Sequence, residues 1–189
     1  MSGRSPVIPR HAYKLLNHGP TTLVTSAHQG RSNVMAAAWV MPLDFDPPKL
    51  VAIVAAGTLT RELVEASGEL VVNVPARSLA DATYAVGTSS GHEADKFARF
   101  GIATEPASIV GAPYVRDAVA WLECRVIPEP HMQTQYDLFV LEVIAAFADD
   151  RVFADGQWTF PEDELRTLHH TNRGIFHLIG ERLQAKPPR

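Results

Sequence analysis

The sequence of 189 residues is poor in cysteine and contains no long apolar run. Its single cysteine, Cys124, excludes a disulfide bond within the chain and is typical of proteins in a reducing compartment. The longest apolar run, residues 50–56, is far too short to cross a bilayer. Residues 1–11 contain two prolines and two arginines and lack the apolar core of a signal peptide. We therefore expect a cytoplasmic protein that does not associate with membranes.

The basic residues do not cluster anywhere along the chain. The 17 lysines and arginines are scattered, and the formal net charge is -4 at pH 7. Binding to nucleic acid needs a clustered positive surface, so the charge pattern argues against this function. Since the sequence has no internal linker, we expect one domain over residues 10–185. Residues 1–9 and 186–189, rich in proline and charge, are expected to form an N-terminal arm and a C-terminal tail.

Several motifs of catalytic and nucleotide-binding sites are absent. The sequence has neither the G-x-S-x-G motif of hydrolases nor the G-x-G-x-x-G and P-loop motifs of nucleotide-binding folds. Cys124 lies in an apolar strand pattern, where a thiol usually serves as inert packing. His169 and His170 are adjacent, so on a strand they point to opposite sides and do not chelate a metal ion together. We therefore expect no metal site.

Six segments rich in β-branched and aliphatic residues predict strands. They cover residues 21–26, 33–41, 50–56, 70–74, 118–127 and 138–147. Pro42, Pro47 and Pro48 are expected to end the second strand, because proline cannot donate to a strand ladder. The last strand is apolar on both faces except for Glu142, so it needs cover beyond the core of one barrel. Short turns favour a closed antiparallel barrel over a parallel α/β sheet, but periodicity does not distinguish a barrel from a sandwich.

Three helices are predicted between these strands. They cover residues 60–67, about 78–86 and about 90–100. Gly68 and Gly101 follow the first and the third helix, where glycine commonly ends a helix. The second and third are expected to begin with capping patterns at Ser78 and Ser90.

Small and hydroxyl residues gather in three segments that suit a flat, anionic ligand. Two loops of glycine, threonine and serine, at residues 57–60 and 87–91, precede predicted helices. Each is a candidate phosphate site, because the free N–H groups and the dipole at a helix start favour anions, although such residues are more often simple caps. Residues 35–38, M-A-A-A, leave strand backbone exposed where large side chains would block a flat ligand.

Taken together, these segments resemble the flavin reductase-like, or flavoredoxin, family. The sequence N-V-M-A-A-A-W at 33–39 is similar to that family's N-x-M-x-x-S/A-W strand, and F-D-P-P follows at 45–48. The most specific match is G-T-S-S-G-H-E-A-D-K-F at 87–97, which resembles the family's G-T-x-S-G-x-x-x-D-K-F. Further matches lie at residues 60–63, 70–75 and 122–126, so the ordered set spans most of the chain.

The resemblance implies a mainly β fold with flanking helices, namely a six-stranded antiparallel FMN-binding split barrel of Greek-key type. It also implies a homodimer whose subunits bury each other, with the flavin near their interface. Asn33, Met35, Ala36, Ala38 and Trp39 would then hold the flavin ring and ribityl chain. The alternative for Trp39 is that it only fills the core.

The same resemblance implies a phosphate site. Thr58, Thr60 and Lys96 would face the phosphate, with Ser90 and Gly91 close to the flavin. Elementary chemistry agrees, because a dianionic phosphate favours a helix N-terminus, hydroxyl groups and a point charge.

At some positions the sequence departs from the family pattern. Many members have an arginine and an aromatic residue or histidine near the first helix, where this chain has Ala55, Ala56 and Leu59. The alternatives are a lower phosphate affinity, or a substitute such as Arg61 or Arg77. Where nicotinamide-using members have a histidine before the last long strand, this chain has Tyr136. Tyr136 is therefore the candidate catalytic residue, and the alternative is that it caps a strand at the barrel rim.

The resemblance implies an FMN-dependent NAD(P)H oxidoreductase of the flavin reductase type. NADH or NADPH would pass a hydride to FMN, and the electrons would go to a small-molecule or protein acceptor, such as free flavin or a ferric chelate. No side chain need act as general acid or base, because the cofactor carries the chemistry. Two alternatives remain open: an electron carrier that is reduced by another protein, and an FMN-binding module without turnover.

Overall fold

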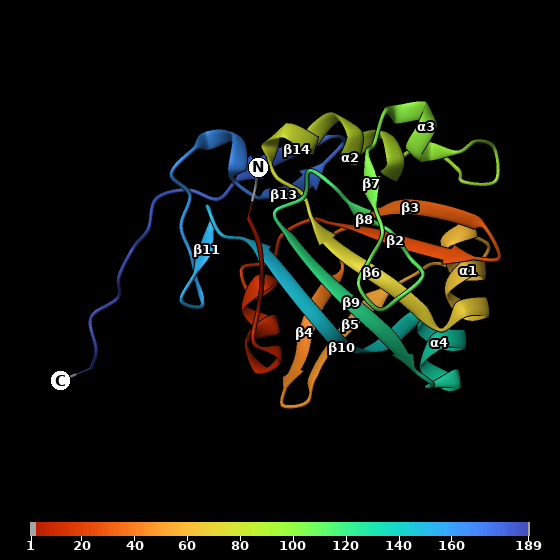
Figure 1. The fold of residues 1–189 in the computed structure, drawn as a ribbon, viewed down its shortest axis with the longest axis horizontal. Coiled ribbons are helices and arrows are strands. Elements are labelled where there is room, and N and C mark those ends of the chain that lie inside the picture. The colour runs from red at the N-terminus through yellow and green to blue at the C-terminus, as the bar shows by residue number, and fades with distance from the viewer. Residues whose placement is uncertain (1–2, 189) are drawn as a thin grey trace.

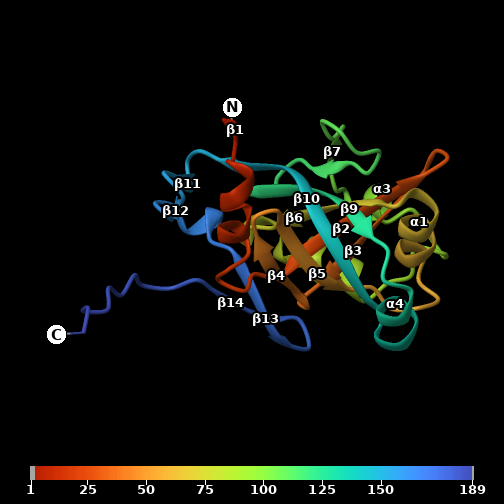
Figure 2. The same cartoon turned by 90° about the horizontal axis from the view of Figure 1, so that it is seen from below.

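The computed structural model describes residues 3–188, whose main feature is an antiparallel sheet of eight strands curled into a barrel (Figures 1 and 2). Seven strands follow one another in the order β3-β2-β6-β9-β10-β5-β4, and the eighth, β1, pairs with β10. Their bounds are β1 Arg4–Pro6, β2 Thr22–His28, β3 Arg31–Ala37, β4 Val40–Phe45, β5 Pro48–Ile53, β6 Glu69–Val74, β9 Ala120–Ile127 and β10 Leu138–Asp149.

The barrel is split between β3 and β4, the two ends of the strand order. Only Ala38 and Trp39 separate these strands in sequence, yet the chain changes partners there. The carbonyl of Ala37 still accepts a hydrogen bond from the Thr22 hydroxyl of β2 at 2.9 Å. The carbonyl of Trp39 instead accepts one from the amide of Ile53, the last residue of β5, at 3.1 Å. The predicted class, a mainly β antiparallel split barrel with flanking helices, is therefore confirmed.

The predicted count of six strands was too low for two reasons. The segment 33–41 forms the end of one strand and the start of another, because of the change of partner at Ala38. In addition, Arg4–Pro6 of the predicted N-terminal arm pair with Asp149, Ala148 and Phe147 of β10. At the other end, the chain leaves the barrel as an extended segment after Gly180, before the predicted tail begins at Lys186 (Figure 1).

Pro42 does not end its strand, as the sequence had suggested. It lies inside β4, opposite Leu50 of β5, and the strand continues to Phe45 after a register shift. Proline is tolerated here because β4 is the last strand of the order, so one of its edges has no ladder to donate to. Pro48 is the first residue of β5, another position where proline costs little.

Alternating residues of the central strands fill two cores. Val24, Val72 and Leu122 belong to the cluster inside the barrel. Their neighbours Leu23 and Trp121 point to the outer face, where helix α2 (Ala80–Gly87) and the segment 102–118 cover them. This explains why the sequences of β2, β6 and β9 are apolar on both faces.

A buried carboxylate fixes the covering segment onto the sheet. Glu123 of β9 is fully buried and accepts hydrogen bonds from the amides of Ser108, Ile109 and Val110 and from the hydroxyls of Ser108 and Tyr114. Burial alone would raise the pKa of Glu123, but these hydrogen bonds outweigh it and hold the pKa below its ordinary value. Glu123 is thus an ionised structural residue.

Within residues 3–188, four α-helices flank the barrel: α1 Leu59–Ser67, α2, α3 Lys96–Phe100 and α4 Pro130–Tyr136. The first agrees with the prediction, since Thr58 caps it and Gly68 ends it at a φ of 71°. The predicted capping serines do not cap the other two. Ser78 lies within the 3-10 helix η2 (Arg77–Leu79). The third helix begins only at Lys96, where the Asp95 carboxylate caps it by accepting hydrogen bonds from the amides of Phe97 and Ala98. Residues 91–94 form a turn and a bend instead.

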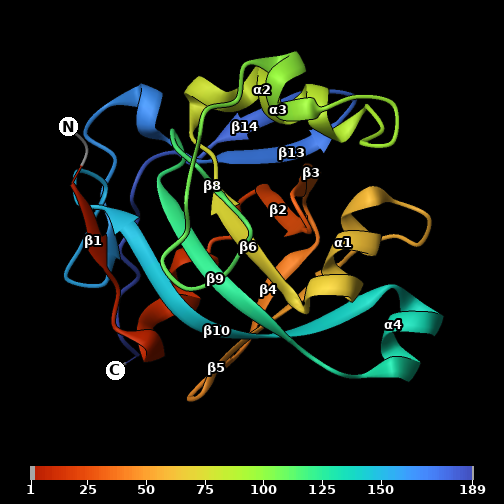
Figure 3. The ribbon, with the colours of Figure 1, turned by 45° about the vertical axis from the view of Figure 1, so that its right-hand side comes forward.

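The remaining elements are short. They are the 3-10 helices η1 (Pro9–Leu15) and η3 (Asp163–Leu165) and the strand pairs β7 (Thr104–Glu105) with β8 (Tyr114–Val115), β11 (Phe153–Ala154) with β12 (Gln157–Trp158), and β13 (Leu168–Asn172) with β14 (Ile175–Leu178). Figure 3 shows α2, α3 and the β13–β14 hairpin together on one side of the barrel, above β2 and β3. None of the helices found within residues 3–188 has the length and apolarity needed to span a membrane.

Candidate functional site

A cleft of about 420 Å³ lies where β3, the start of α1 and the loop after α2 meet. We call it the α1 cleft. Its lining is dominated by small and hydroxyl residues, as the sequence had suggested for this region. Of the ten predicted cofactor residues, eight line it: Asn33, Met35, Ala36, Thr58, Thr60, Ser90, Gly91 and Lys96.

Asn33 connects the two sides of the α1 cleft. From β3, its amide nitrogen donates a hydrogen bond to the hydroxyl of Thr60 on α1 at 2.8 Å, and both residues are buried. On the opposite side, the backbone of Gly91 approaches the Asn33 amide so closely that an added Cβ would lie 2.4 Å from Oδ1. Only glycine therefore fits at position 91 without a shift of Asn33.

Substituting Gly91 with alanine is expected to weaken ligand binding in the cleft, because the methyl group displaces the Asn33 amide. Overpacking of this kind usually costs about 1–3 kcal/mol of stability as well. FMN titration and thermal unfolding measure the two effects. Gly180→Ala is the matched control, since its Cβ would meet nothing within 4 Å. Unchanged FMN affinity in Gly91→Ala would exclude this contact from the site.

The start of α1 offers free backbone amides to the cleft. Thr58 is occupied as the cap, because its hydroxyl accepts the Arg61 amide at 3.2 Å and donates to the Ala55 carbonyl at 2.9 Å. The amides of Leu59 and Thr60 come first in the helix and have no carbonyl acceptor within it. Together with the helix dipole, they favour an anion at this end.

Lys96 brings a positive charge into the same cleft. The residue is only 5% exposed, and its ammonium group donates one hydrogen bond, to the Val86 carbonyl at 2.8 Å. Burial lowers the pKa of Lys96, because the charged form loses water without gaining a carboxylate partner among the described residues. An anion in the cleft would compensate this buried charge.

Arg61 and Arg77, the predicted substitutes for a phosphate-binding arginine, lie elsewhere. The Arg61 guanidinium donates to the carbonyls of Val54 and Gln133 at 3.0 Å and to the Asp137 carboxylate at 3.1 Å, and so ties α1 to α4. Arg77 pairs with Glu164 at 3.4 Å. Neither side chain lines the α1 cleft, so this prediction was wrong.

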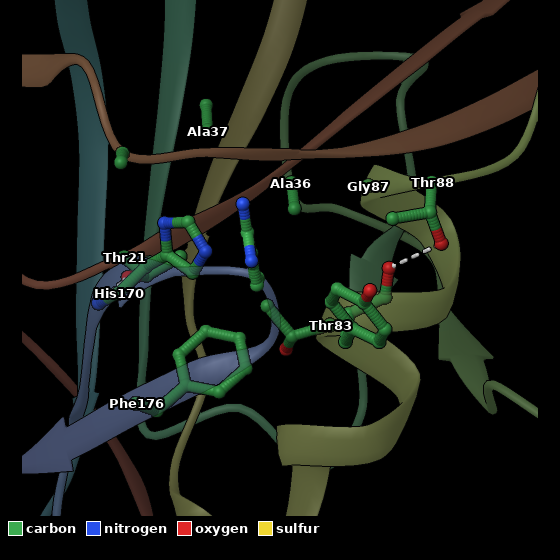
Figure 4. Close-up of a pocket in the computed structure, with 11 residues that line it drawn as sticks. Thr21, Ala36, Ala37, Thr83, Gly87, Thr88, His170 and Phe176 are labelled. Atoms are coloured by element: carbon green, nitrogen blue, oxygen red, sulfur yellow. Dashed lines mark hydrogen bonds between the residues drawn. The ribbon is translucent and has the colours of Figure 1, made fainter.

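A second cavity, of about 320 Å³, adjoins the first under the β13–β14 hairpin. We call it the hairpin pocket. It shares Ala36, Gly87 and Thr88 with the α1 cleft, so the two lie side by side. Its other lining residues are Thr21, Ala37, Ala38, Thr83, Tyr84, His170, Arg173 and Phe176. Figure 4 shows the rings of His170 and Phe176 opposite Ala36 and Ala37 of β3, with Thr83 of α2 between them.

The sequence reasoning missed the hairpin residues. His170 was considered only as a metal ligand, and nothing local to residues 168–178 marks them as part of a site. The contacts that hold the hairpin next to the start of β2 are long-range. The Thr21 hydroxyl accepts a hydrogen bond from the His170 amide at 2.8 Å, and the Thr21 amide donates one to the Leu168 carbonyl at 2.7 Å. Neither periodicity nor spacing predicts such contacts.

Three predicted residues are not in the α1 cleft. Ala38 lines the hairpin pocket instead. Trp39 is 74% exposed, so it does not fill the core of its own chain. Tyr136 is 60% exposed at the end of α4, where its ring meets the edge of His131, and it lines neither the cleft nor the pocket. Tyr136 therefore does not approach the site in this chain.

The protein is thus an antiparallel split barrel with a cleft at the start of α1 that is lined mainly by small residues. The chain matches the family "Flavin reductase like domain" over residues 16–177. It is 43% identical over 188 residues to the protein YddH of Escherichia coli (strain K12), which covers 98% of this chain and 100% of that one. The chain therefore belongs to the flavin reductase-like domain family.

Two solved structures share the fold. The crystal structure of an FMN-binding domain of a flavin reductases-like enzyme from Shewanella baltica OS155 matches with a TM-score of 0.95 and 43% identity, covering 98% of both chains. Flavoredoxin of Desulfovibrio vulgaris (Miyazaki F) matches with a TM-score of 0.77 and 24% identity, covering 88% of this chain and 90% of that one. The family and fold implied by the sequence motifs are thus confirmed.

Proposed function

We propose that this protein binds FMN across the α1 cleft and works as a flavin-dependent reductase. The observation that carries the proposal is the buried, unneutralised charge of Lys96 in the same cleft as the first amides of α1. FMN has a dianionic phosphate at one end and a flat ring at the other. The cleft provides a cation and a helix start for the first, and Ala36 of β3 for the second, with Ala38 next to it in the hairpin pocket. The similarity to the Shewanella baltica FMN-binding domain supports the same ligand.

The backbone around the cleft also suits a flat ligand. Gly91 has no room for a side chain, and an added Cβ at Gly87 would lie 3.2 Å from the Cβ of Ala36. Larger residues at these positions would fill the space between β3 and the loop after α2. The residues present therefore fit FMN in shape as well as in charge.

Each group of residues has a separate part in binding. Thr60, Lys96 and the α1 amides would hold the phosphate, and Thr58 would contribute through its backbone, since its hydroxyl caps the helix. Asn33 and Met35 would line the ribityl chain, with Ser90 and Gly91 across the cleft. Ala36 and Ala38 would lie against the ring.

When bound, FMN supplies two-electron redox chemistry. Among the described residues that line the α1 cleft, Lys96 is the only titratable side chain. It is engaged with the Val86 carbonyl and faces the proposed phosphate, so it is not placed to move a proton at the ring. The role of the protein is therefore to bind and orient the cofactor, and to exclude water from the side of the cleft that is lined by small residues.

NADH or NADPH is the proposed reductant, and a small molecule or a protein is the proposed acceptor. Anaerobic mixing of the FMN-loaded protein with each nicotinamide tests this step, and bleaching of the flavin absorbance is the expected result. Bleaching by light but not by nicotinamide would instead favour an electron carrier. Because Tyr136 lines neither cavity, Tyr136→Phe is expected to leave the rate of bleaching unchanged.

A homodimer is the second part of the proposal. Trp39 and three residues of β4 (Met41, Leu43 and Phe45) are all more than half exposed, and they lie close together along this edge strand. Monomeric proteins rarely expose several large apolar side chains so close together. We call this group of four side chains the β4 face. Since it carries no charge of its own, it is self-complementary and suits an isologous contact with a second copy.

A further inference from the structure

The loop that leads from β5 into α1, residues 54–58, carries the first amides of the helix but has little packing of its own. Ala55, Ala56 and Gly57 in its middle are exposed, and none has a side chain larger than a methyl group. An anion at this end of α1 therefore depends on backbone amides and on Lys96, so the exact position of the loop decides how well the amides reach it.

Arg61 contacts this loop at both of its ends. At the helix end, the Arg61 amide donates a hydrogen bond to the Thr58 hydroxyl at 3.2 Å. At the strand end, the Arg61 guanidinium donates one to the Val54 carbonyl at 3.0 Å. A single residue therefore holds the two ends of the loop at a fixed separation, although its own side chain does not line the α1 cleft.

The Arg61 guanidinium is itself held in place by α4 and β10. It is 8% exposed and lies over the Phe139 ring, 4.7 Å from the ring centroid. The Gln133 carbonyl of α4 accepts a hydrogen bond from it at 3.0 Å, and the carboxylate of Asp137, which follows α4, accepts another at 3.1 Å. The Asp137 carbonyl also accepts the Val54 amide at 2.9 Å. The end of α4, beside α1 in Figure 3, thus holds both Arg61 and the loop.

The chemistry of arginine suits this arrangement. A guanidinium is planar and presents several N–H donors in fixed directions, so its charge-assisted hydrogen bonds are strong and geometrically strict. Without Arg61, the Val54 carbonyl would lose this donor, and the loop would be held at the strand end by fewer bonds. The first amides of α1 would then be free to shift.

We propose that Arg61 is a positioning residue for the phosphate end of the α1 cleft. It fixes the loop that carries the first α1 amides and does not touch the ligand, while Asp137 acts through Arg61. The proposal rests on the proposed function for the identity of the ligand. It differs from two simpler roles, namely general stabilisation of the fold and attraction of the phosphate by the positive charge of Arg61 at a distance.

Arg61→Met separates positioning from general stabilisation. FMN affinity is expected to fall about tenfold, whereas the affinity for riboflavin, which lacks the phosphate, should stay nearly unchanged. Arg166→Met is the matched control, because Arg166 also donates to a carbonyl, that of Ile179 at 2.8 Å, and pairs with Asp163, but lines neither cavity. It should leave both affinities unchanged. Unchanged FMN affinity in Arg61→Met, or an equal loss for both ligands, would overturn the proposal.

Asp137→Gly separates positioning from attraction at a distance, because the two roles predict opposite signs. Removing a negative charge would tighten FMN binding if only charge mattered, whereas positioning predicts a loss of at least about threefold. Glycine suits the φ of 53° at this position, where it commonly ends helices, so the variant should fold. Asp155→Gly, at a φ of 52° in the turn between β11 and β12, is the matched control and should not change FMN affinity. Tighter or unchanged FMN binding in Asp137→Gly would overturn the proposal.

Hydrogen exchange in the FMN-free proteins tests the position of the loop without the ligand. The amides of residues 54, 61 and 62, which are hydrogen-bonded at the two ends of the loop, are expected to exchange faster in Arg61→Met than in the wild type. Unchanged exchange at these amides would overturn the proposal. Faster exchange together with no FMN binding by the wild type would mean that Arg61 does fix the loop and that the proposed function is wrong.

Discussion

Replacing Lys96 with methionine is expected to weaken FMN binding by about 1–3 kcal/mol, the range for losing a hydrogen bond to a charged group. This corresponds to a Kd that is higher by about fivefold to 150-fold. Riboflavin, which lacks the phosphate, should bind the variant and the wild type almost equally. Calorimetric titration with both ligands measures the difference.

The stability of the FMN-free Lys96→Met protein is expected not to fall. In the folded protein, burial disfavours the ammonium group, as the lowered pKa of Lys96 shows, so removing the charge removes a cost. Loss of FMN binding with an intact thermal midpoint would therefore report on the ligand and not on folding. Lys186→Met, in the exposed C-terminal segment, is the control and should change neither quantity. Equal loss of FMN and riboflavin affinity would contradict a phosphate role for Lys96.

An aspartate in place of Leu43 is expected to convert a dimer into a 20.7 kDa monomer. In an isologous contact, the substitution places a charge on the interface twice, and each unpaired charge in an apolar contact costs roughly several kcal/mol. Leu43 is 52% exposed in the single chain, so the folded monomer should tolerate the change. Sedimentation at low micromolar concentration, with circular dichroism as a test of folding, measures the outcome.

Leu183→Asp serves as the control for the dimer experiment. Leu183 is 93% exposed in the C-terminal segment, so the same added charge there should leave the dimer intact. A wild-type protein that is monomeric at this concentration would contradict the proposed homodimer, and FMN binding by that monomer would contradict a flavin held near a subunit interface, as the family resemblance implies. A dimer that survives Leu43→Asp would place the contact on another face.

Local signals in the sequence predicted those elements whose ends are set by neighbouring residues. The cap at Thr58 and the left-handed Gly68 bound α1, and both act within one turn of the helix. Asn33, Thr60 and Lys96 came together as the motifs implied, because these motifs occupy the strand and helix starts that surround the α1 cleft. The residues that line the cleft could therefore be predicted from the sequence.

Other features depended on partners that lie far away in the sequence. The division of segment 33–41 at Ala38 reflects a change of partner strand, not a change in residue pattern. One difference is local: Ser90 was expected to start a helix, but Asp95 caps it, since its carboxylate accepts hydrogen bonds from the amides of Phe97 and Ala98. His170 and Arg173 join the site only because the hairpin packs on β2 and α2.

Titration of the purified protein with FMN tests the central claim most directly. The account predicts stoichiometric binding, with a flavin absorbance spectrum that changes on binding and an affinity well above that for riboflavin. The preference for FMN should disappear in Lys96→Met. Absence of FMN binding at high micromolar concentration in the folded wild-type protein would contradict the account.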